Sequence, residues 1–212
     1  MKITCFSDTH RHRPELGKGD MLIFAGDDDI TDIKTLINFT QYIKKQDFKY
    51  KIMIGGNHDF FIKNLFAKEY LIENNIIYLE DQMIEIEGIK IYGTPYTPQF
   101  MNWAFMESED MLLKRYSLIP KDVNILVSHG PAYGVRDQIV YGNSPSIKSG
   151  KFLGSKALAE VLPSLIDLKY HIFGHIHGSY GTTHSSINCS ICDERYNMAN
   201  EPIELCLFTE VK

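Results

Sequence analysis

Residues that bind divalent metal ions follow five short apolar runs in this sequence. The run at residues 3–7 leads directly into Asp8, and the run at residues 21–25 leads, after one glycine, into Asp27. Three later runs end in the same way, and the complete set is Asp8, His10, Asp27, Asn57, His58, Asp59, His129, His175 and His177. Carboxylate, imidazole and amide groups together suit borderline divalent ions such as Mn²⁺, Fe²⁺ and Zn²⁺. The pattern therefore predicts a metal site assembled from five separate segments.

The placement of these residues at run ends predicts that they lie close together in the fold. In open α/β sheets, functional groups gather in the crevice beyond the carboxyl ends of the strands. The candidate ligands are seven: Asp8, His10, Asp27, Asn57, His129, His175 and His177. Seven ligands are more than one tetrahedral metal ion can bind, so two metal ions are implied. A carboxylate that both ions share holds such pairs about 3.5–4 Å apart.

Taken singly, each motif is weak evidence for a metal site. An Asp-x-His pair is usually a solvated turn, and an Asn-His-Asp run is often a loop whose side chain bonds its own backbone. Five of the eight histidines nevertheless follow apolar runs: His10, His58, His129, His175 and His177. Their shared position, together with the aspartates and the asparagine in matching places, favours a metal site over a chance arrangement.

The alternation of apolar runs with helical stripes predicts an α/β sandwich with mixed β-sheets flanked by helices. An i, i+3, i+4 stripe predicts a helix over residues 31–45; a second helix is expected at residues 155–165, and residues 100–116 are expected to be mostly helical. Strands are expected at residues 3–7, 21–25, 51–54, 76–79, 83–86, 89–92, 125–128, 171–173, 186–192 and 203–208. No repeat or linker divides the sequence, so we expect one domain over residues 1–212.

The composition limits the partners and the cellular location that we expect. A formal net charge of -5 argues against binding to nucleic-acid phosphates. No apolar run approaches the roughly 18 residues that cross a bilayer, and the first residues lack a secretory apolar segment, so a cytoplasmic protein without a membrane partner is expected. The four cysteines, Cys5, Cys189, Cys192 and Cys206, are then expected to stay reduced. Cys189 and Cys192 form a lone CxxC, which we interpret as buried structural thiols; the oligomeric state is left open.

Five motifs resemble the signature blocks of calcineurin-like metallophosphoesterases. They are Asp8-x-His10, Gly26-Asp27, Gly56-Asn57-His58-Asp59, Ser128-His129-Gly130 and Gly174-His175-x-His177. Residues 93–98, 102–105, 129–134 and 187–196 are similar to the small, single-domain branch of metallophosphoesterase-domain proteins, which extends the resemblance over nearly the whole chain. That branch is associated with phosphodiesterase activity, including activity on cyclic nucleotides. Some of its members lack the first histidine of the last block, whereas His175 is present here, so the resemblance implies competent metal binding.

The resemblance also implies an assignment of ligands and a mechanism. Asp8, His10, Asp27 and His177 would hold one ion; Asp27, Asn57, His129 and His175 would hold the other. Mn²⁺ is the first expectation, with Fe, Zn, Co or Mg as alternatives. A hydroxide that bridges the metals would attack phosphorus, and His58 would protonate the leaving oxygen, with Asp59 as its orienting partner.

Residues outside the motifs suggest how a substrate binds. Arg136 could steer an anionic substrate towards His129. Tyr96 and Tyr133, like Trp103, could stack on a nucleobase, although aromatic side chains more often belong to the core.

Four functions fit the motifs. The first is a phosphodiesterase that acts on small molecules, including cyclic nucleotides. The others are a phosphomonoesterase or protein phosphatase, a DNA nuclease, and a protein-binding scaffold without activity. Little sequence lies outside the motif blocks to build a protein-substrate surface, the acidic charge argues against a nuclease, and the complete ligand set argues against a scaffold. The first function is therefore favoured.

Overall fold

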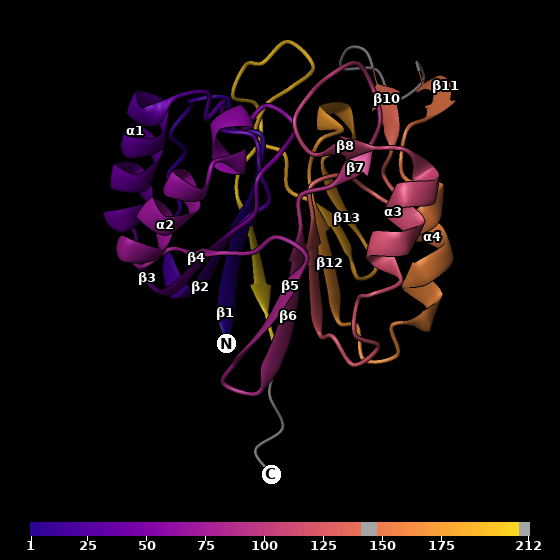
Figure 1. The fold of residues 1–212 in the computed structure, drawn as a ribbon, viewed down its shortest axis with the longest axis horizontal. Coiled ribbons are helices and arrows are strands. Elements are labelled where there is room, and N and C mark those ends of the chain that lie inside the picture. Colours follow the sequence, from indigo (N-terminus) through magenta and orange to yellow (C-terminus); the bar gives the residue numbers. More distant parts are fainter. Residues whose placement is uncertain (141–147, 208–212) are drawn as a thin grey trace.

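The structure is a computed structural model that describes residues 1–140 and 148–207, and it contains two β-sheets with helices outside them (Figure 1). The first sheet has the order β15-β1-β2-β3-β4, with β15 (Ile203–Cys206), β1 (Lys2–Phe6), β2 (Lys18–Phe24), β3 (Asp47–Met53) and β4 (Ile77–Tyr78). Neighbouring strands from β1 to β4 are parallel, and β15 is antiparallel to β1.

The second sheet has the order β13-β14-β12-β9-β6-β5. Its strands are β13 (Gly181–Thr183), β14 (Ser186–Asn188), β12 (Tyr170–Phe173), β9 (Ile125–Ser128), β6 (Ile89–Thr94) and β5 (Gln82–Ile86). The four central strands are parallel and the two edge strands are antiparallel, so the predicted mixed character is confirmed. Short strands β7 (Thr97–Pro98), β8 (Met106–Glu107), β10 (Gln138–Val140) and β11 (Lys148–Phe152) form two separate pairs.

Three buried clusters hold these layers together. Ile23 of β2 and Val127 of β9 belong to the cluster that joins the two sheets. The helices α1 (Ile33–Lys44) and α2 (Leu65–Glu73) pack on the first sheet, and α3 (Glu109–Tyr116) and α4 (Lys156–Val161) pack on the second (Figure 1). Short 3-10 turns lie at Phe60–Lys63, Leu162–Ser164 and His177–Ser179. The predicted sandwich is therefore confirmed.

Helix α1 forms where its sequence pattern predicts a helix. Asp32 caps its first turn, since the Asp32 side chain accepts from the backbone N–H of Thr35 and the Thr35 hydroxyl accepts from the N–H of Asp32. Leu36, Phe39 and Ile43 are buried on one face of the helix. This face supplies the apolar area that attaches α1 to the first sheet.

Two expectations about the elements are corrected, and one helix was not predicted. Residues 100–116 are not mostly helical, because only α3 is helical and Met101 and Phe105 have φ angles of 59° and 52°, which a right-handed helix does not allow. The strand expected at residues 186–192 ends at Asn188, where the chain leaves the second sheet. Helix α2 was not expected. Its sequence shows no clear apolar stripe, because apolar residues such as Leu65 and Ile72 also occupy its exposed face. The last strand ends at Cys206, and the expected end at residue 208 lies outside the described residues.

The two sheets are joined directly beside the carboxyl end of β1. The backbone N–H of Ser7 donates to the carbonyl of Cys189, and the N–H of Ile191 donates to the carbonyl of Ser7. The segment that follows β14 therefore connects the second sheet to the first at the point where Asp8 begins.

Within residues 1–140 and 148–207, no helix has both the length and the apolar character that crossing a membrane requires.

Candidate metal centre

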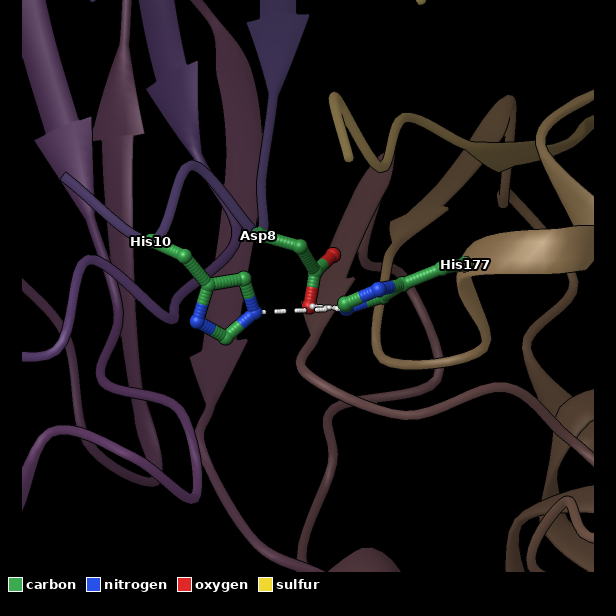
Figure 2. A group of neighbouring side chains, drawn as sticks. All are labelled: Asp8, His10 and His177. Carbon is green, nitrogen blue, oxygen red and sulfur yellow. Dashed lines mark hydrogen bonds and ion pairs between the residues drawn. The ribbon is translucent and has the colours of Figure 1, made fainter. Parts of the chain in front are cut away.

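Loops at the carboxyl ends of the strands bring metal-binding side chains into one cup. Three groups have ligand atoms within 4.8 Å of one another: Asp8, His10 and His177; Asp27, His129 and His175; and His10, Asp29 and His58. Figure 2 shows the first group, in which the Asp8 carboxylate and the rings of His10 and His177 point toward one another from segments far apart in the sequence. Six of the seven predicted ligands therefore meet, as two triads.

Three of the histidines are held in one orientation by hydrogen bonds from Nδ1. In His10, His129 and His177 this atom lies 2.9 Å from an oxygen that only accepts: the Asp29 carboxylate, the Ala25 carbonyl and the Asp193 carbonyl, respectively. The proton of each neutral ring must therefore be on Nδ1. The Nε2 atom of each ring then presents a lone pair, as metal-binding histidines usually do.

These Nε2 atoms face other acceptors. Nε2 of His129 lies 2.7 Å from Oδ1 of Asn57 and 3.2 Å from Oδ2 of Asp27. Nε2 of His177 lies 3.4 Å from Oδ1 of Asp8 and 3.3 Å from Nε2 of His10. Lone pairs that converge in this way repel one another unless a proton or a cation lies between them. The donor set therefore fits divalent metal ions.

The titration behaviour of the ligands follows from the same contacts. Although burial opposes the charged ring, the Asp27 carboxylate raises the pKa of His129 to about 9, and the bond with Asp8 raises the pKa of His177 to about 9. Burial also opposes ionisation of Asp27, yet the charge of His129 lowers its pKa to about 2. Protons on His129 and His177 therefore occupy the cup in the metal-free protein.

Four of the seven predicted ligands have a left-handed backbone. The φ angles are 51° at Asp8, 42° at His10, 69° at Asp27 and 69° at His175. Such angles in residues other than glycine cost on the order of 1–3 kcal/mol each and persist only where the surrounding structure enforces them. The surrounding structure therefore stabilises a strained backbone, and this backbone directs the four side chains into the cup.

Two glycines let the backbone approach the aspartates. A Cβ atom at Gly174 would lie 2.0 Å from Oδ2 of Asp8, and one at Gly56 would lie 2.1 Å from Oδ1 of Asp27. Any larger residue at these positions would displace the carboxylates.

Asp59 supports the Asp27 loop, and this corrects the expectation that it orients His58. The Asp59 carboxylate is fully buried and accepts four backbone N–H groups, which belong to Asp27, Asp28, Ile30 and Gly56. It therefore fixes the strained backbone that presents Asp27.

The carboxylate beside His58 belongs to Asp29. Its Oδ1 lies 3.4 Å from Nδ1 of His58 and 2.9 Å from Nδ1 of His10, so that one oxygen faces both rings. The run Asp27-Asp28-Asp29 was visible in the sequence, but nothing in the sequence indicated that its third member turns toward two histidines.

The metal centre opens into a cleft of about 580 Å³. His58, His175 and His177 line this cleft, and so does Tyr133, one of the three residues expected to bind substrate. Tyr96 packs elsewhere: the Arg115 guanidinium lies 3.5 Å from the centroid of its ring, and its hydroxyl donates to Glu80 at 3.2 Å.

Arg136 also lies away from the cleft lining. Its guanidinium donates to the backbone carbonyls of Ser179, Tyr180 and Thr182. These bonds fix the segment that follows His177, which is a structural task rather than contact with a substrate.

Comparisons with known proteins point to one family. A family model described as calcineurin-like phosphoesterase matches residues 1–179. Metallophosphoesterase domain-containing protein 1 of Homo sapiens is 31% identical over 239 residues, which cover 98% of this chain and 71% of the human protein. A UPF0046 protein of Caenorhabditis elegans is 33% identical over 243 residues, which cover 96% of this chain and 59% of that protein.

A solved structure shares the fold of this chain. It matches with a TM-score of 0.62 at 14% sequence identity, covering 88% of this chain and 89% of its own. At that identity the likeness concerns the fold alone.

The role of Asp59 predicts a loss of stability in Asp59→Asn. The amide nitrogen cannot accept, so two buried N–H groups lose their partner, and we expect the free energy of unfolding to fall by about 2–6 kcal/mol at about 1–3 kcal/mol per group. Urea denaturation of the metal-free protein measures this change. Asp32→Asn is the matched control, since Asp32 is exposed and asparagine also caps helices. Equal effects of the two substitutions would contradict the role of Asp59.

The raised pKa values of His129 and His177 predict that metal affinity depends on pH. Below a pH of about 9 both rings hold protons that must leave before a metal binds. We therefore expect Mn²⁺ affinity to rise with pH from neutrality to about 9 and then level off, with proton release during binding. Titration calorimetry in buffers with different ionisation enthalpies measures that release. Binding that is independent of pH and releases no protons would show that the rings do not compete with the metal.

Proposed function

The chain belongs to the calcineurin-like phosphoesterase family, and from that premise we propose that it hydrolyses phosphodiester bonds of small molecules with two divalent metal ions. The observation that carries the proposal is the convergence of histidine lone pairs and buried carboxylates in two triads. Because the chain spans 59% of the Caenorhabditis elegans relative and 71% of the human one, the activity is proposed for this chain alone.

Each triad would hold one ion. Asp8, His10 and His177 would hold the first, and His129 and His175, with Asn57, would hold the second. Asp27 would contact both ions, since it is 2% exposed and belongs to the second triad. Its charge also reaches the first triad: although burial opposes the charged ring, the hydrogen bond with Asp29 raises the pKa of His10, and the Asp27 carboxylate adds to that rise. When bound, the ions would neutralise phosphate oxygens and lower the pKa of an attacking water. Mn²⁺ is the first candidate, because it accepts both carboxylate and imidazole ligands.

His58 would protonate the leaving oxygen. Its side chain is 26% exposed and lines the cleft, so it is open to a substrate. Asp29 faces Nδ1, and the Trp103 ring packs with its centroid 4.9 Å from that of His58. Both contacts hold the ring while Nε2 stays available to donate. General acid catalysis of this kind typically contributes ~10²–10⁴-fold to the rate.

Asn57 offers a second donor to the substrate. Its Oδ1 faces His129, whereas its Nδ2 is buried without a hydrogen-bond partner among residues 1–140 and 148–207. Buried donors are rarely left unpaired in native structures. This N–H group would therefore donate to a phosphate oxygen as charge develops there.

The size of the cleft supports a small diester as the substrate. The cleft of about 580 Å³ extends beyond the metal centre and leaves room for an ester group on the phosphate. A cytoplasmic location is also part of the proposal, and it is supported by the cysteines Cys5, Cys189, Cys192 and Cys206, which are all free.

A substrate screen tests the proposal directly. Protein loaded with Mn²⁺ is assayed with bis(4-nitrophenyl) phosphate, 4-nitrophenyl phosphate, and 2′,3′- and 3′,5′-cyclic nucleotides. We expect hydrolysis of diesters to exceed hydrolysis of the monoester. A preference for the monoester would identify a phosphomonoesterase instead, and no turnover with any divalent ion would contradict catalysis altogether.

The acid role of His58 predicts a dependence on the leaving group. His58→Gln should lower kcat by ~10²–10⁴-fold on diesters with alkyl leaving groups, and much less on nitrophenyl esters, whose leaving oxygen needs no proton. Asp29→Asn should act in the same direction but more weakly. Metal content, measured by elemental analysis, should be unchanged in His58→Gln. Equal losses on both substrate classes would exclude the acid role.

A further inference from the structure

Large aromatic side chains are exposed inside the cleft that leads away from the metal centre. Phe100 is 61% exposed, and Tyr133 and Phe152 are each 42% exposed, although all three line a concave cavity. Apolar surface that stays in contact with water in such a place is typical of a ligand-binding wall.

The aromatic rings form two groups within this cleft. Phe100 contacts Trp103 at a centroid distance of 5.6 Å, and Trp103 in turn contacts His58 at 4.9 Å. Tyr133 contacts Phe152 of β11 at 5.3 Å. The first group begins at the residue that would protonate the leaving oxygen, so the departing ester group would enter the cleft at Trp103.

The acidic side chains that line this part of the cleft have hydrogen-bond partners, whereas the basic side chains have no ion pair. Glu109 accepts from the Ser155 hydroxyl and from two backbone N–H groups, and Glu194 accepts from the N–H of Gly178. Lys151 and Lys156 line the same cleft, and neither has an ion pair with any residue in the described ranges 1–140 and 148–207. The acidic groups are thus engaged in the fold. The Lys156 ammonium lies 5.7 Å from the centroid of the Tyr133 ring, a contact that leaves its charge without an anionic partner, so both lysines remain open to an anion.

We propose that Phe100, Trp103, Tyr133, Lys151, Phe152 and Lys156 form a subsite, the aromatic arm, that binds the leaving group of the substrate. The chemistry of the arm selects a flat aromatic group that carries an additional anionic substituent. Rings of the substrate stack on the exposed aromatic faces, and the two lysines pair with the distal anion. This inference rests on the proposed function, because it assumes that the phosphate lies at the metal centre.

Binding of three phosphonates to the Mn²⁺-loaded protein tests the arm without any turnover. Methylphosphonate offers only the anchoring group, benzylphosphonate adds a ring, and 4-carboxybenzylphosphonate adds an anion to that ring. Trp103 is the single tryptophan of the chain and contacts His58, so its fluorescence reports binding. We expect benzylphosphonate to bind about tenfold more tightly than methylphosphonate, because stacking on an aromatic side chain strengthens binding by at least about this factor. The carboxylate should add a further gain that salt weakens.

Substitutions then locate the subsite. Phe152→Ala should remove most of the advantage of the benzyl group, and Phe152→Leu, which keeps an apolar side chain in β11, should do the same. Lys151→Ala combined with Lys156→Ala should remove only the gain from the carboxylate. Phe66→Ala is the matched control, since Phe66 is 46% exposed on α2 and lies outside the cleft lining. None of these changes should alter the affinity for methylphosphonate.

The outcomes separate the two proposals. Equal binding of methylphosphonate and benzylphosphonate, or a benzyl advantage that persists in both Phe152 variants, would overturn the aromatic arm. The proposed function instead fails if the metal-loaded protein hydrolyses no ester, whatever the phosphonates do.

Discussion

The structure depends on the burial of two carboxylates, Asp8 and Asp27, among histidine nitrogens that face them with lone pairs. Both aspartates are almost inaccessible to water, at 0% and 2% exposure. Removing an ion from water costs several kcal/mol even after relaxation, so each charge needs a compensating partner. In the metal-free protein this partner is the protonated ring of His129 or His177, whose pKa is raised to about 9. In the loaded protein two divalent ions would replace those protons.

Much of the surrounding fold serves to hold these buried polar groups in place. The Asp8 carboxylate accepts from the hydroxyls of Ser7 and Ser190, which belong to segments that meet where the two sheets join. Asp59 performs a similar task for Asp27 by accepting four backbone N–H groups. The backbone strain at the ligands is therefore offset by buried hydrogen bonds that converge on the same loops.

The strands and the convergence of the candidate metal ligands could be predicted from the sequence because their signal is local. A buried parallel strand is a short apolar run, and a ligand at its carboxyl end follows within a few residues, as Asp8 and His129 do. The tasks of Asp29 and Asp59 could not be predicted, because they depend on which distant N–H or ring nitrogen each carboxylate meets after folding. Left-handed backbone at Phe105 likewise has no signature in a stretch that is otherwise compatible with a helix.

The expectation for Arg136 shows a related limit of sequence analysis. A cationic side chain close to a candidate metal ligand in the sequence can bind backbone carbonyls instead of a substrate.

The most direct test of the two-metal centre is anomalous diffraction at the manganese absorption edge from crystals soaked in Mn²⁺. Two anomalous peaks are predicted, one beside Asp8 and His177 and one beside His129, with Asp27 next to both. A single peak, or an empty cup at saturating Mn²⁺, would contradict the two-metal centre.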